Sequence, residues 1–321
     1  MQFLVYLSRR ISEMKKLLFL LICVSILSAC TKNQQHKRSM YYWQTTLHFD
    51  SLEQHFLQAH DVSRLYVRYF DVVLDDRAQP VPNATISFED KVPQHIEVVP
   101  TVYIVNDCMR QNVDSLPSLI LKRILQMNET NDIKNVNEIQ IDCDWTMQTQ
   151  ERYFRFLKSL QNLCHNKGII LSTTIRLHQL SLSVPPADRG VLMVYNTGDV
   201  TKLDVRNPIL DVNDVKPYLH NLKDYKLDLS AAYPLFTWKV LFRGSKYIGI
   251  MHSDDDLPVL SGDSIAVRQP SLHEILTTLK AINAEREDVH KEVILFDLSK
   301  KNIQRFNHND YEKIFNAKNQ Y

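Results

Sequence analysis

The stretch EIQIDCDWTMQTQ, residues 138–150, alternates apolar and polar side chains and then places two aspartates one residue apart. Successive side chains of a β-strand point to opposite faces. One face therefore carries Ile139, Ile141, Cys143 and Trp145, and the other carries Gln140, Asp142 and Asp144. The apolar face, Trp145 included, is expected in the core. The rest of the chain indicates that the two acids line a cavity rather than face bulk water.

Eight segments rich in β-branched and aromatic residues predict strands. In chain order they are 41–46, 64–72, 96–105, 138–145, 169–177, 191–196, 227–236 and 293–298. Helical patterns lie between most of them, as in TQERYFRFLKSLQNLC after the fourth, but 75–94 and 179–189 show none. This alternation predicts a single α/β domain over residues 40–321, a TIM-like (β/α)8 barrel with one or two degenerate helical crossovers.

The N-terminal segment predicts export. Positive residues 14–16 precede the apolar run LLFLLICVSIL and then Leu27-Ser28-Ala29-Cys30. This order is typical of a secretory signal, and the run is too short to span a bilayer comfortably. The ending resembles the bacterial lipoprotein lipobox, which implies acylation, for instance with palmitate, at Cys30. Residues 1–30 are then the signal, with 1–13 as an upstream extension. The alternative is a plain signal peptide with a chance cysteine.

Residues 31–39, TKNQQHKRS, are polar and predict a tether between the lipid and the barrel. The tether has no acidic run of the kind that marks surface export in some lipoproteins. We therefore expect a lipid-anchored protein of the bacterial cell envelope, at the outer membrane and facing the periplasm rather than exposed at the cell surface.

The composition excludes several classes of function. The 38 Lys and Arg balance 37 Asp and Glu, so no basic field favours nucleic acid. Hydrophobic residues at 44% and charged residues at 23% are ordinary for a globular protein. The three cysteines that follow Cys30 have no zinc or disulfide spacing. His48, His55 and His60 are taken as surface residues, and no metal or cofactor is expected.

Polar residues gather where the predicted strands end, which is where this fold places its chemistry. The expected group at the barrel mouth is Asp71, Asp142, Asp144, Asp297, Arg68, Arg176, Tyr195, Asn196 and Tyr233. Aromatic rings with acids and amides suit a polyhydroxylated ligand such as a glycan. The alternative is that Arg68 or Arg176 only neutralises Asp142 inside the barrel. Residues 257–270 could form a flap over the mouth.

Two motifs carry a resemblance. IQIDCDWT resembles the fourth-strand D-G-x-D-x-D-x-E motif of chitinase-like (family 18-type) glycoside hydrolases, and LMVYN resembles their sixth-strand M-x-Y-D/N. Asp142 and Asp144 match the two later aspartates. However, Ile139 replaces the first aspartate and Thr146 stands where that family has its catalytic glutamate. Threonine cannot protonate a leaving oxygen.

Across nearly the whole chain, phrases such as RYFDV, LSTTIR and AYPLFTWKVLFR resemble Bacteroides-type lipoproteins with a glycoside-hydrolase-like barrel, a resemblance that brings no function with it. The leading hypothesis is an envelope protein acting on or binding a glycan. As an enzyme it would use Asp144 as general acid, with Asp142 tuning it. Tyr195 and Asn196 would orient the substrate and Arg176 would hold a carboxylate or hydroxyl. The rival hypothesis is a non-catalytic glycan binder or envelope-assembly lipoprotein.

Overall fold

The computed structural model describes residues 36–134, 136–251 and 256–316. The predicted signal segment, Cys30 and tether residues 31–35 lie outside these residues. The first strand begins at Lys37, so the last three residues of the predicted tether belong to the barrel. None of the described helices is both long and apolar enough to cross a membrane.

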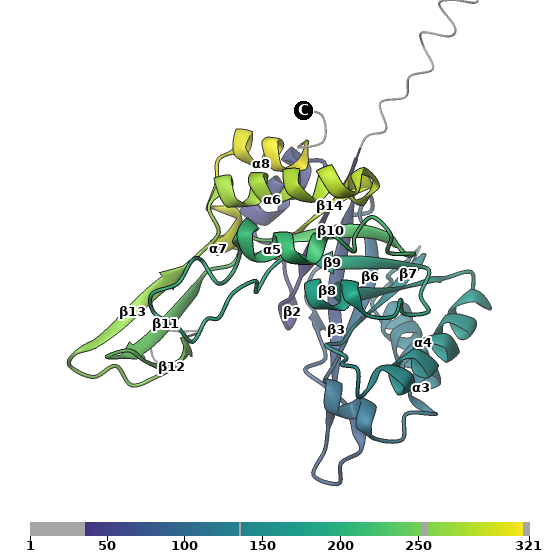
Figure 1. Cartoon of the computed structure of the whole chain (residues 1–321). Helices are drawn as coiled ribbons and strands as arrows, with labels where there is room; N and C mark the ends of the chain where they lie inside the picture. The colour runs from purple at the N-terminus through teal and green to yellow at the C-terminus, as the bar shows by residue number, and fades with distance from the viewer. Residues whose placement is uncertain (1–35, 135, 252–255, 317–321) are drawn as a thin grey trace, which may run out of the picture. The chain divides into compact units, whose positions relative to one another are not determined.

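Eight parallel strands close into a barrel, which confirms the predicted fold (Figure 1). They are β1 (Lys37–Tyr42), β3 (Arg64–Leu74), β6 (Glu97–Ile104), β7 (Glu138–Asp142), β8 (Ile170–Arg176), β9 (Arg189–Met193), β10 (Asp228–Pro234) and β14 (Glu292–Phe296). Each strand pairs with the next along the chain, and β1 closes the ring by pairing in parallel with both β14 and β3. All eight predicted strands are therefore present.

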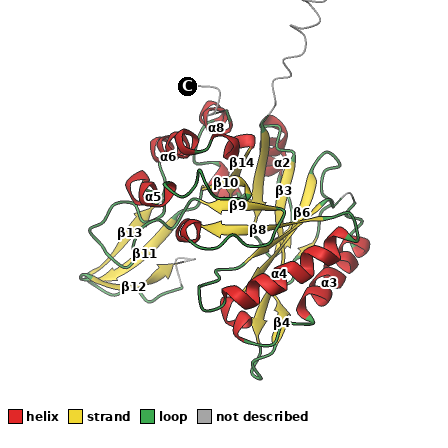
Figure 2. Ribbon diagram, turned by 45° about the vertical axis from the view of Figure 1, so that its right-hand side comes forward, coloured by secondary structure: helices red, strands yellow, loops and turns green. Residues whose placement is uncertain are grey.

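Helices cover the outside of the strands (Figure 2). They are α2 (Ser51–Ala59), α3 (Leu116–Thr130), α4 (Gln150–His165), α5 (Val212–Leu219), α6 (Leu272–Glu285), α7 (Lys300–Ile303) and α8 (His308–Phe315), with short 3₁₀ turns η1 (Asn106–Arg110), η2 (Leu177–Ser181) and η3 (Glu287–Lys291). Capping boxes at Asp50 and Ser271 fix where α2 and α6 begin.

Two crossovers are degenerate, as the sequence predicts. After β3 the chain forms β4 (Pro80–Asn83), which is antiparallel to β3, and β5 (Ser87–Phe88), which pairs with β2 (Thr46–Leu47). After β8 only the turn η2 precedes β9. Helices thus do not separate every pair of strands, yet the ring of strands remains closed.

The two faces of β7 behave as the sequence predicts. Ile139, Ile141, Cys143 and Trp145 are fully buried in the core between the strands and the helices. On the other face, Gln140 points into the barrel, where its Oε1 accepts a hydrogen bond of 2.7 Å from the Tyr41 hydroxyl. A small inner core packs around it: Tyr41, Tyr66, Val99, Val191, Met193, Ala232 and Ile294. The barrel interior is therefore filled, and Asp142 lies one layer above Gln140.

A buried ion-pair network fills the end of the barrel where the strands begin. Arg64 Nη1 bonds Glu138 at 3.0 Å and contacts Glu292 at 3.4 Å. Arg189 reaches the same two acids, at 3.1 and 2.5 Å. These four residues come from four different strands, so the network ties the barrel together at this end.

A small antiparallel sheet is inserted between β10 and α6, and the sequence prediction missed it. It consists of β11 (Trp238–Arg243), β12 (Lys246–Met251) and β13 (Asp263–Arg268), with β11 in the centre. The segment suggested as a flap, 257–270, contributes β13, which pairs with β11 over its whole length. This part of the flap is therefore the edge strand of a sheet.

Candidate functional site

Asp142 and Asp144 lie together where β7 ends and differ in exposure. Asp142 is buried, and its Oδ1 accepts hydrogen bonds from Thr174 Oγ1 at 2.6 Å and Arg176 Nη2 at 2.9 Å. Burial raises the pKa of Asp142, and Arg176 and Thr174 only partly offset this effect. The Asp144 side chain is 52% exposed and pairs with Arg176 Nε. The two acids therefore share one guanidinium.

Arg176, the last residue of β8, bridges the two acids from the neighbouring strand. Burial alone would lower its pKa, but Asp142, Tyr195 and Asp144 raise it well above the usual arginine value. The sequence left open whether this arginine neutralises Asp142 or holds a ligand. The structure shows it neutralising Asp142 and pairing with Asp144 as well.

A pocket of about 270 Å³ opens beside this ion pair. It is lined by Asp144, Arg176, Leu177, His178, Met193, Tyr195, Asn196, Thr197 and Tyr218. Four of the predicted site residues therefore meet: Asp144, Arg176, Tyr195 and Asn196. Asn196 has a positive φ of 55°, a conformation that asparagine tolerates better than most residues. Among the lining residues, Asp144 is the one carboxylate.

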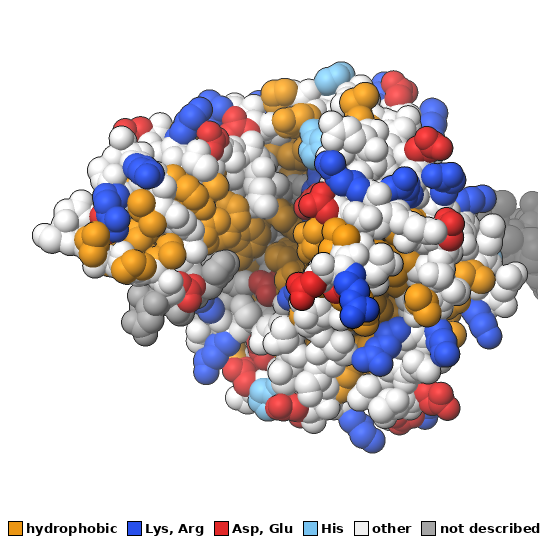
Figure 3. Space-filling view, turned by 90° about the horizontal axis from the view of Figure 1, so that it is seen from below, with side chains coloured by type: hydrophobic (Ala, Val, Ile, Leu, Met, Phe, Trp, Pro, Cys, Tyr) orange, Lys and Arg blue, Asp and Glu red, His pale blue; other side chains and the backbone are white. Residues whose placement is uncertain are grey.

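The pocket lies on the face where the barrel strands end. Seen from below, the molecular surface is hollowed near the centre, with hydrophobic side chains on both sides of the hollow (Figure 3). A ligand can therefore meet apolar and charged groups together.

Arg68 and Asp71 lie at the same end of the barrel but pair with each other rather than line the pocket. Asp71 Oδ1 accepts from Arg68 Nε at 2.7 Å, and the Arg68 guanidinium lies 5.6 Å from the centre of the Trp43 ring. In strand register, Asp71 is beside Tyr103, which is beside Asp142. This ion pair is therefore two strands away from Asp142.

Tyr233 and Asp297 were predicted in the mouth, and the structure places both elsewhere. Tyr233 is fully buried on the outer face of β10, where its hydroxyl bonds His290 Nε2 at 2.7 Å. The side chains of its neighbours Ala232 and Pro234 face the inside of the barrel. Asp297 follows Phe296 on the outward side and accepts a hydrogen bond from Asn302, and burial raises its pKa to about 6.

Several mouth residues escaped the sequence prediction. Trp43, Tyr103 and Phe296 lie at strand ends, and strand alternation places their side chains on the inward face. The same alternation in the sequence could have predicted them. Strand parity cannot find the other mouth residues, which are Thr197 and Phe236 from loops, Tyr218 from α5 and Trp238 from the inserted sheet. The rings form a continuous run: Trp43–Phe296 at 5.4 Å, Phe296–Tyr195 at 5.2 Å, Tyr195–Phe236 at 5.6 Å and Phe236–Trp238 at 5.4 Å between centroids.

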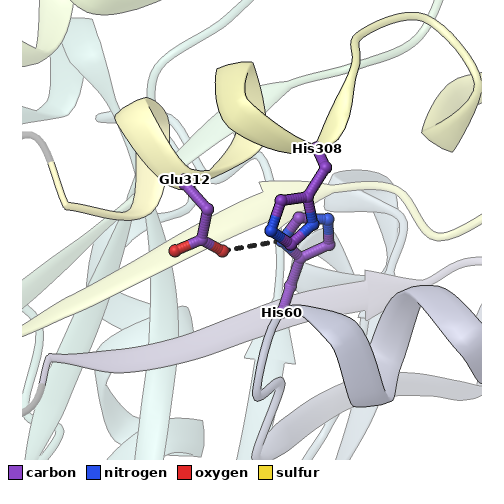
Figure 4. A group of neighbouring side chains, drawn as sticks. All are labelled: His60, His308 and Glu312. Carbon is purple, nitrogen blue, oxygen red and sulfur yellow. Dashed lines mark hydrogen bonds and ion pairs between the residues drawn. The ribbon is translucent and has the colours of Figure 1, made fainter.

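One group elsewhere has metal-ligand chemistry: His60, His308 and Glu312 (Figure 4). Glu312 already accepts two hydrogen bonds from Arg38, one from His60 Nδ1 at 2.8 Å and one from Asn316. A carboxylate has about four acceptor positions, so none remains for a cation beside the guanidinium. We assign the group to packing of α2 against α8. His60, unlike the exposed His48 and His55, is buried, which corrects its prediction as a surface residue.

A two-carboxylate hydrolase needs a second acid across the site from Asp144. Glu151 and Asp199, which follow the predicted strands 138–145 and 191–196, are the sequence candidates for this second acid. Glu151 is exposed in the first turn of α4, and Asp199 bonds Thr201 and Lys202 on an exposed loop. Neither lines the pocket. Thr146, in the position of the family glutamate, is exposed, and its backbone N–H bonds Thr149 Oγ1.

Comparisons with known proteins identify the kind of barrel. No protein-family model and no curated protein matches the sequence. Among solved structures, chitinase from Chromobacterium violaceum ATCC 12472 matches with a TM-score of 0.60 and 11% identity, covering 89% of this chain and 99% of that one. The Bacillus cereus spore cortex-lytic enzyme SleL matches at 0.55 and 15%, covering 87% and 74%. The GH18 chitinase ChiB from Flavobacterium johnsoniae matches at 0.54 and 11%, covering 88% and 94%.

The structural neighbours of this chain are thus glycoside hydrolases with chitinase-like TIM barrels. At these identities the likeness shows the shared fold. A shared fold does not fix the function, which depends on the residues of the site itself.

Proposed function

We propose that this protein binds a glycan at the mouth of the barrel and does not hydrolyse it. The pocket offers a carboxylate, an amide, hydroxyls and an imidazole within a volume of about 270 Å³. Aromatic rings continue from Tyr195 on both sides. Rings can cover the C–H faces of sugars while the polar groups bond their hydroxyls. This combination supports a sugar-sized ligand.

One observation carries the non-catalytic part of the proposal. Among the residues that the structure describes, Asp144 is the one carboxylate lining the pocket, and it is engaged by Arg176. An ion-paired carboxylate accepts hydrogen bonds and does not serve as the proton donor that glycosidic cleavage requires. With threonine at position 146, the described residues that line the pocket do not supply the pair of acids on which most glycosidases depend.

The structural neighbours suggest which glycan to test first. Their names describe two chitinases and a spore cortex-lytic enzyme. We therefore propose oligosaccharides of N-acetylated amino sugars, such as chitin fragments, as the ligand class.

Calorimetric titration of chitin oligosaccharides into the chain from Thr31 onward tests the binding. This chain keeps the whole compact unit His36–Tyr321. We expect saturable binding that Asp144→Asn weakens roughly tenfold, because the charged acceptor of a sugar hydroxyl is replaced by a neutral amide oxygen. Glu285→Gln, an exposed change on α6, is the matched control. Failure of the wild type to bind across a broad glycan panel would refute the proposal.

A second candidate function is hydrolysis with Asp144 as the acid. It is favoured by the raised pKa of the adjacent buried Asp142, since such carboxyls gather at catalytic sites. Release of sugar products by the wild type, and their loss in Asp144→Asn, would establish it.

We also propose that Cys30 is acylated and holds the barrel at the outer membrane, facing the periplasm. The lipobox-like sequence ending at Cys30 supports this proposal. Metabolic labelling with a fatty acid should mark the wild type and not Cys30→Ser. Equal labelling of the two, or labelling of neither, would contradict it.

A further inference from the structure

The inserted sheet concentrates exposed apolar side chains. Among the described residues, four of the eight large hydrophobic side chains that are exposed lie within residues 259–267: Val259, Leu260, Ile265 and Val267. Figure 1 shows the sheet projecting from the barrel, and Figure 3 shows hydrophobic side chains gathered on it at the left. Soluble proteins rarely expose apolar side chains together unless the surface binds a partner. This concentration therefore indicates an interaction surface.

Ile265 and Val267 belong to β13, which lies at an edge of the inserted sheet. Among the described strands, β13 pairs with β11 alone, and this pairing is regular over all of Asp263–Arg268. Asp263 and Arg268 are the charged residues of the strand, and they stand at its two ends. An edge strand without a bulge, a proline or a charge in its middle is suited to pair with another strand.

The opposite edge of the same sheet is built differently. β12 begins at the exposed Lys246 and contains Gly249, and its pairing with β11 shifts register between Leu241 and Phe242. A lysine and a bulge are among the features by which natural edge strands avoid pairing with another chain. The contrast favours β13 as the edge that takes a partner.

The end charges of β13 are already engaged within the chain. Asp263 Oδ1 accepts a hydrogen bond of 2.9 Å from Arg243 Nε, and the Arg268 guanidinium donates to the carbonyl oxygen of Leu203. The side chains that a partner strand meets in the middle of β13 are therefore the apolar ones.

The sequence of β13 is complementary to a second copy of itself. In an antiparallel pair with a two-fold axis at Ala266, each Ile265 lies opposite the partner's Val267. Opposed side chains of antiparallel strands lie on the same face, so the four β-branched side chains form one apolar group. A shift of one residue would place Ile265 opposite the partner's Ala266 and divide the apolar side chains between two faces.

We propose that two copies of this chain associate through their β13 strands, which pair antiparallel with the two Ala266 residues opposite each other. The two inserted sheets then form one continuous sheet across the two-fold axis. The occupant is a second copy because the same strand supplies both halves of the apolar group. This association goes beyond the proposed function and does not depend on what the pocket binds.

Sedimentation equilibrium of the chain from Thr31 onward tests the association, and we expect a reversible dimer. Ile265→Lys and Val267→Glu should each raise the dimer dissociation constant roughly tenfold, because the two-fold axis repeats every lost Ile–Val contact. Leu119→Lys, at a 56% exposed side chain on α3, is the matched control and should keep the wild-type constant. Circular dichroism and the melting temperature confirm that each variant is folded.

A double variant tests the register. Ile265→Lys combined with Val267→Glu places each new lysine opposite a new glutamate of the partner when the axis lies at Ala266. The double variant should therefore recover the association that both single variants lose. A double variant that associates as weakly as the single variants would overturn the proposed pairing.

Oxidative cross-linking gives a second readout. Opposed Cα atoms of antiparallel strands lie about 4.5–5.5 Å apart, a distance that a disulfide can span. Copper phenanthroline in air should therefore join Ala266→Cys into a covalent dimer. Ser264→Cys is the control, since the more exposed Ser264 lies opposite the partner's Arg268 in this register and should stay monomeric. The native Cys108, Cys143 and Cys164 are buried, so the wild type gives the baseline.

Three outcomes would overturn the proposal. The first is a wild type that stays monomeric up to its solubility limit. The second is a dimer that Ile265→Lys leaves equally tight. The third is a monomer that binds phosphatidylglycerol vesicles and loses this binding in Ile265→Lys, because the apolar side chains would then face a membrane.

Discussion

At the scale of single residues, the site is organised around Arg176. Its guanidinium bonds the buried Asp142 and the half-exposed Asp144. Removal of one partner from a buried ion pair leaves an uncompensated charge in a place that water cannot reach. This arginine therefore determines both the stability of the mouth and the charge that the pocket presents.

We predict that Arg176→Ala lowers the free energy of unfolding by about 3 kcal/mol, since Asp142 loses its cation. Asp144→Asn should cost less than about 1 kcal/mol, because that carboxylate is largely in water. Urea denaturation measures both. Equal losses in the two variants would show that Asp142 does not depend on Arg176.

Two tyrosines that looked alike in the sequence should behave differently. Tyr195→Phe removes a hydroxyl from the pocket and should weaken glycan binding. Tyr233→Phe removes the hydrogen bond to His290 and should cost about 1 kcal/mol of stability without changing binding. Calorimetry and denaturation of both variants check this. Weaker glycan binding by Tyr233→Phe would return that residue to the site.

Tyr233 shows that position along a strand is not enough to predict the direction of a side chain. It was assigned to the mouth because it stands near the end of a strand, although strand position does not decide the direction of a side chain. Alternation does, and in β10 the inward positions are Ser230, Ala232 and Pro234. Where parity was followed, as for Asp142, Arg176 and Tyr195, the sequence prediction located residues that the structure places at the mouth.

At the scale of elements, the segments with a clear period were predictable and the others were not. All eight barrel strands, and α4 among the helices, stand close to their predicted positions because burial on one face imposes a clear period. The inserted sheet was missed because its strands do not alternate clearly: β11 buries three consecutive residues, and β13 buries none. Their exposed positions blur the alternation that marks a strand.

The contact of α2 with α8 makes stability depend on pH. Burial lowers the pKa of His60 below its ordinary 6.5, although Glu312 raises it somewhat; His308 and Arg38 also lower it. The unfolded chain therefore takes up a proton first as pH falls. We predict that the free energy of unfolding decreases as pH falls from 6.5 to the lower pKa that His60 has in the folded protein.

The variant His60→Phe removes the titrating group and keeps a ring against Phe56 and Tyr311. Chemical denaturation between pH 7.5 and 5 should show a flatter pH profile for this variant than for the wild type. Exposed His55→Phe is the control and should leave the profile unchanged. An unchanged slope in His60→Phe would contradict the assignment.

At the scale of the whole molecule, the ion-pair network where the strands begin should control acid stability. Burial alone would raise the pKa of Glu292, but Arg189 and Arg64 lower it to about 2. The stability that Glu292 contributes is fully present above its unfolded pKa of about 4.5 and is lost as pH falls toward its folded pKa of about 2. We predict that Glu292→Gln is less stable at pH 7 and loses less stability over this acid range. Glu285→Gln, on the surface, should follow the wild type in denaturation measured at each pH.

The fold of the whole barrel and the chemistry of its pocket point to different functions. Its fold matches those of chitinases and a spore cortex-lytic enzyme, while the described lining of its pocket holds one carboxylate, and that carboxylate is paired. The sequence already indicated this difference from the chitinases, because Thr146 stands where that family has its catalytic glutamate. The structure adds the pairing of Asp144 with Arg176, which depends on two strands meeting in register and could not be read from spacing alone.

Product release is the measurement that tests the central claim most directly. The chain from Thr31 onward is incubated with chitin oligosaccharides and bacterial cell-wall glycans that it binds, and new reducing ends are counted beside Asp144→Asn. We predict that the wild type binds these glycans and releases no more reducing ends than the variant. Release by the wild type that Asp144→Asn abolishes would contradict it and make this barrel a hydrolase.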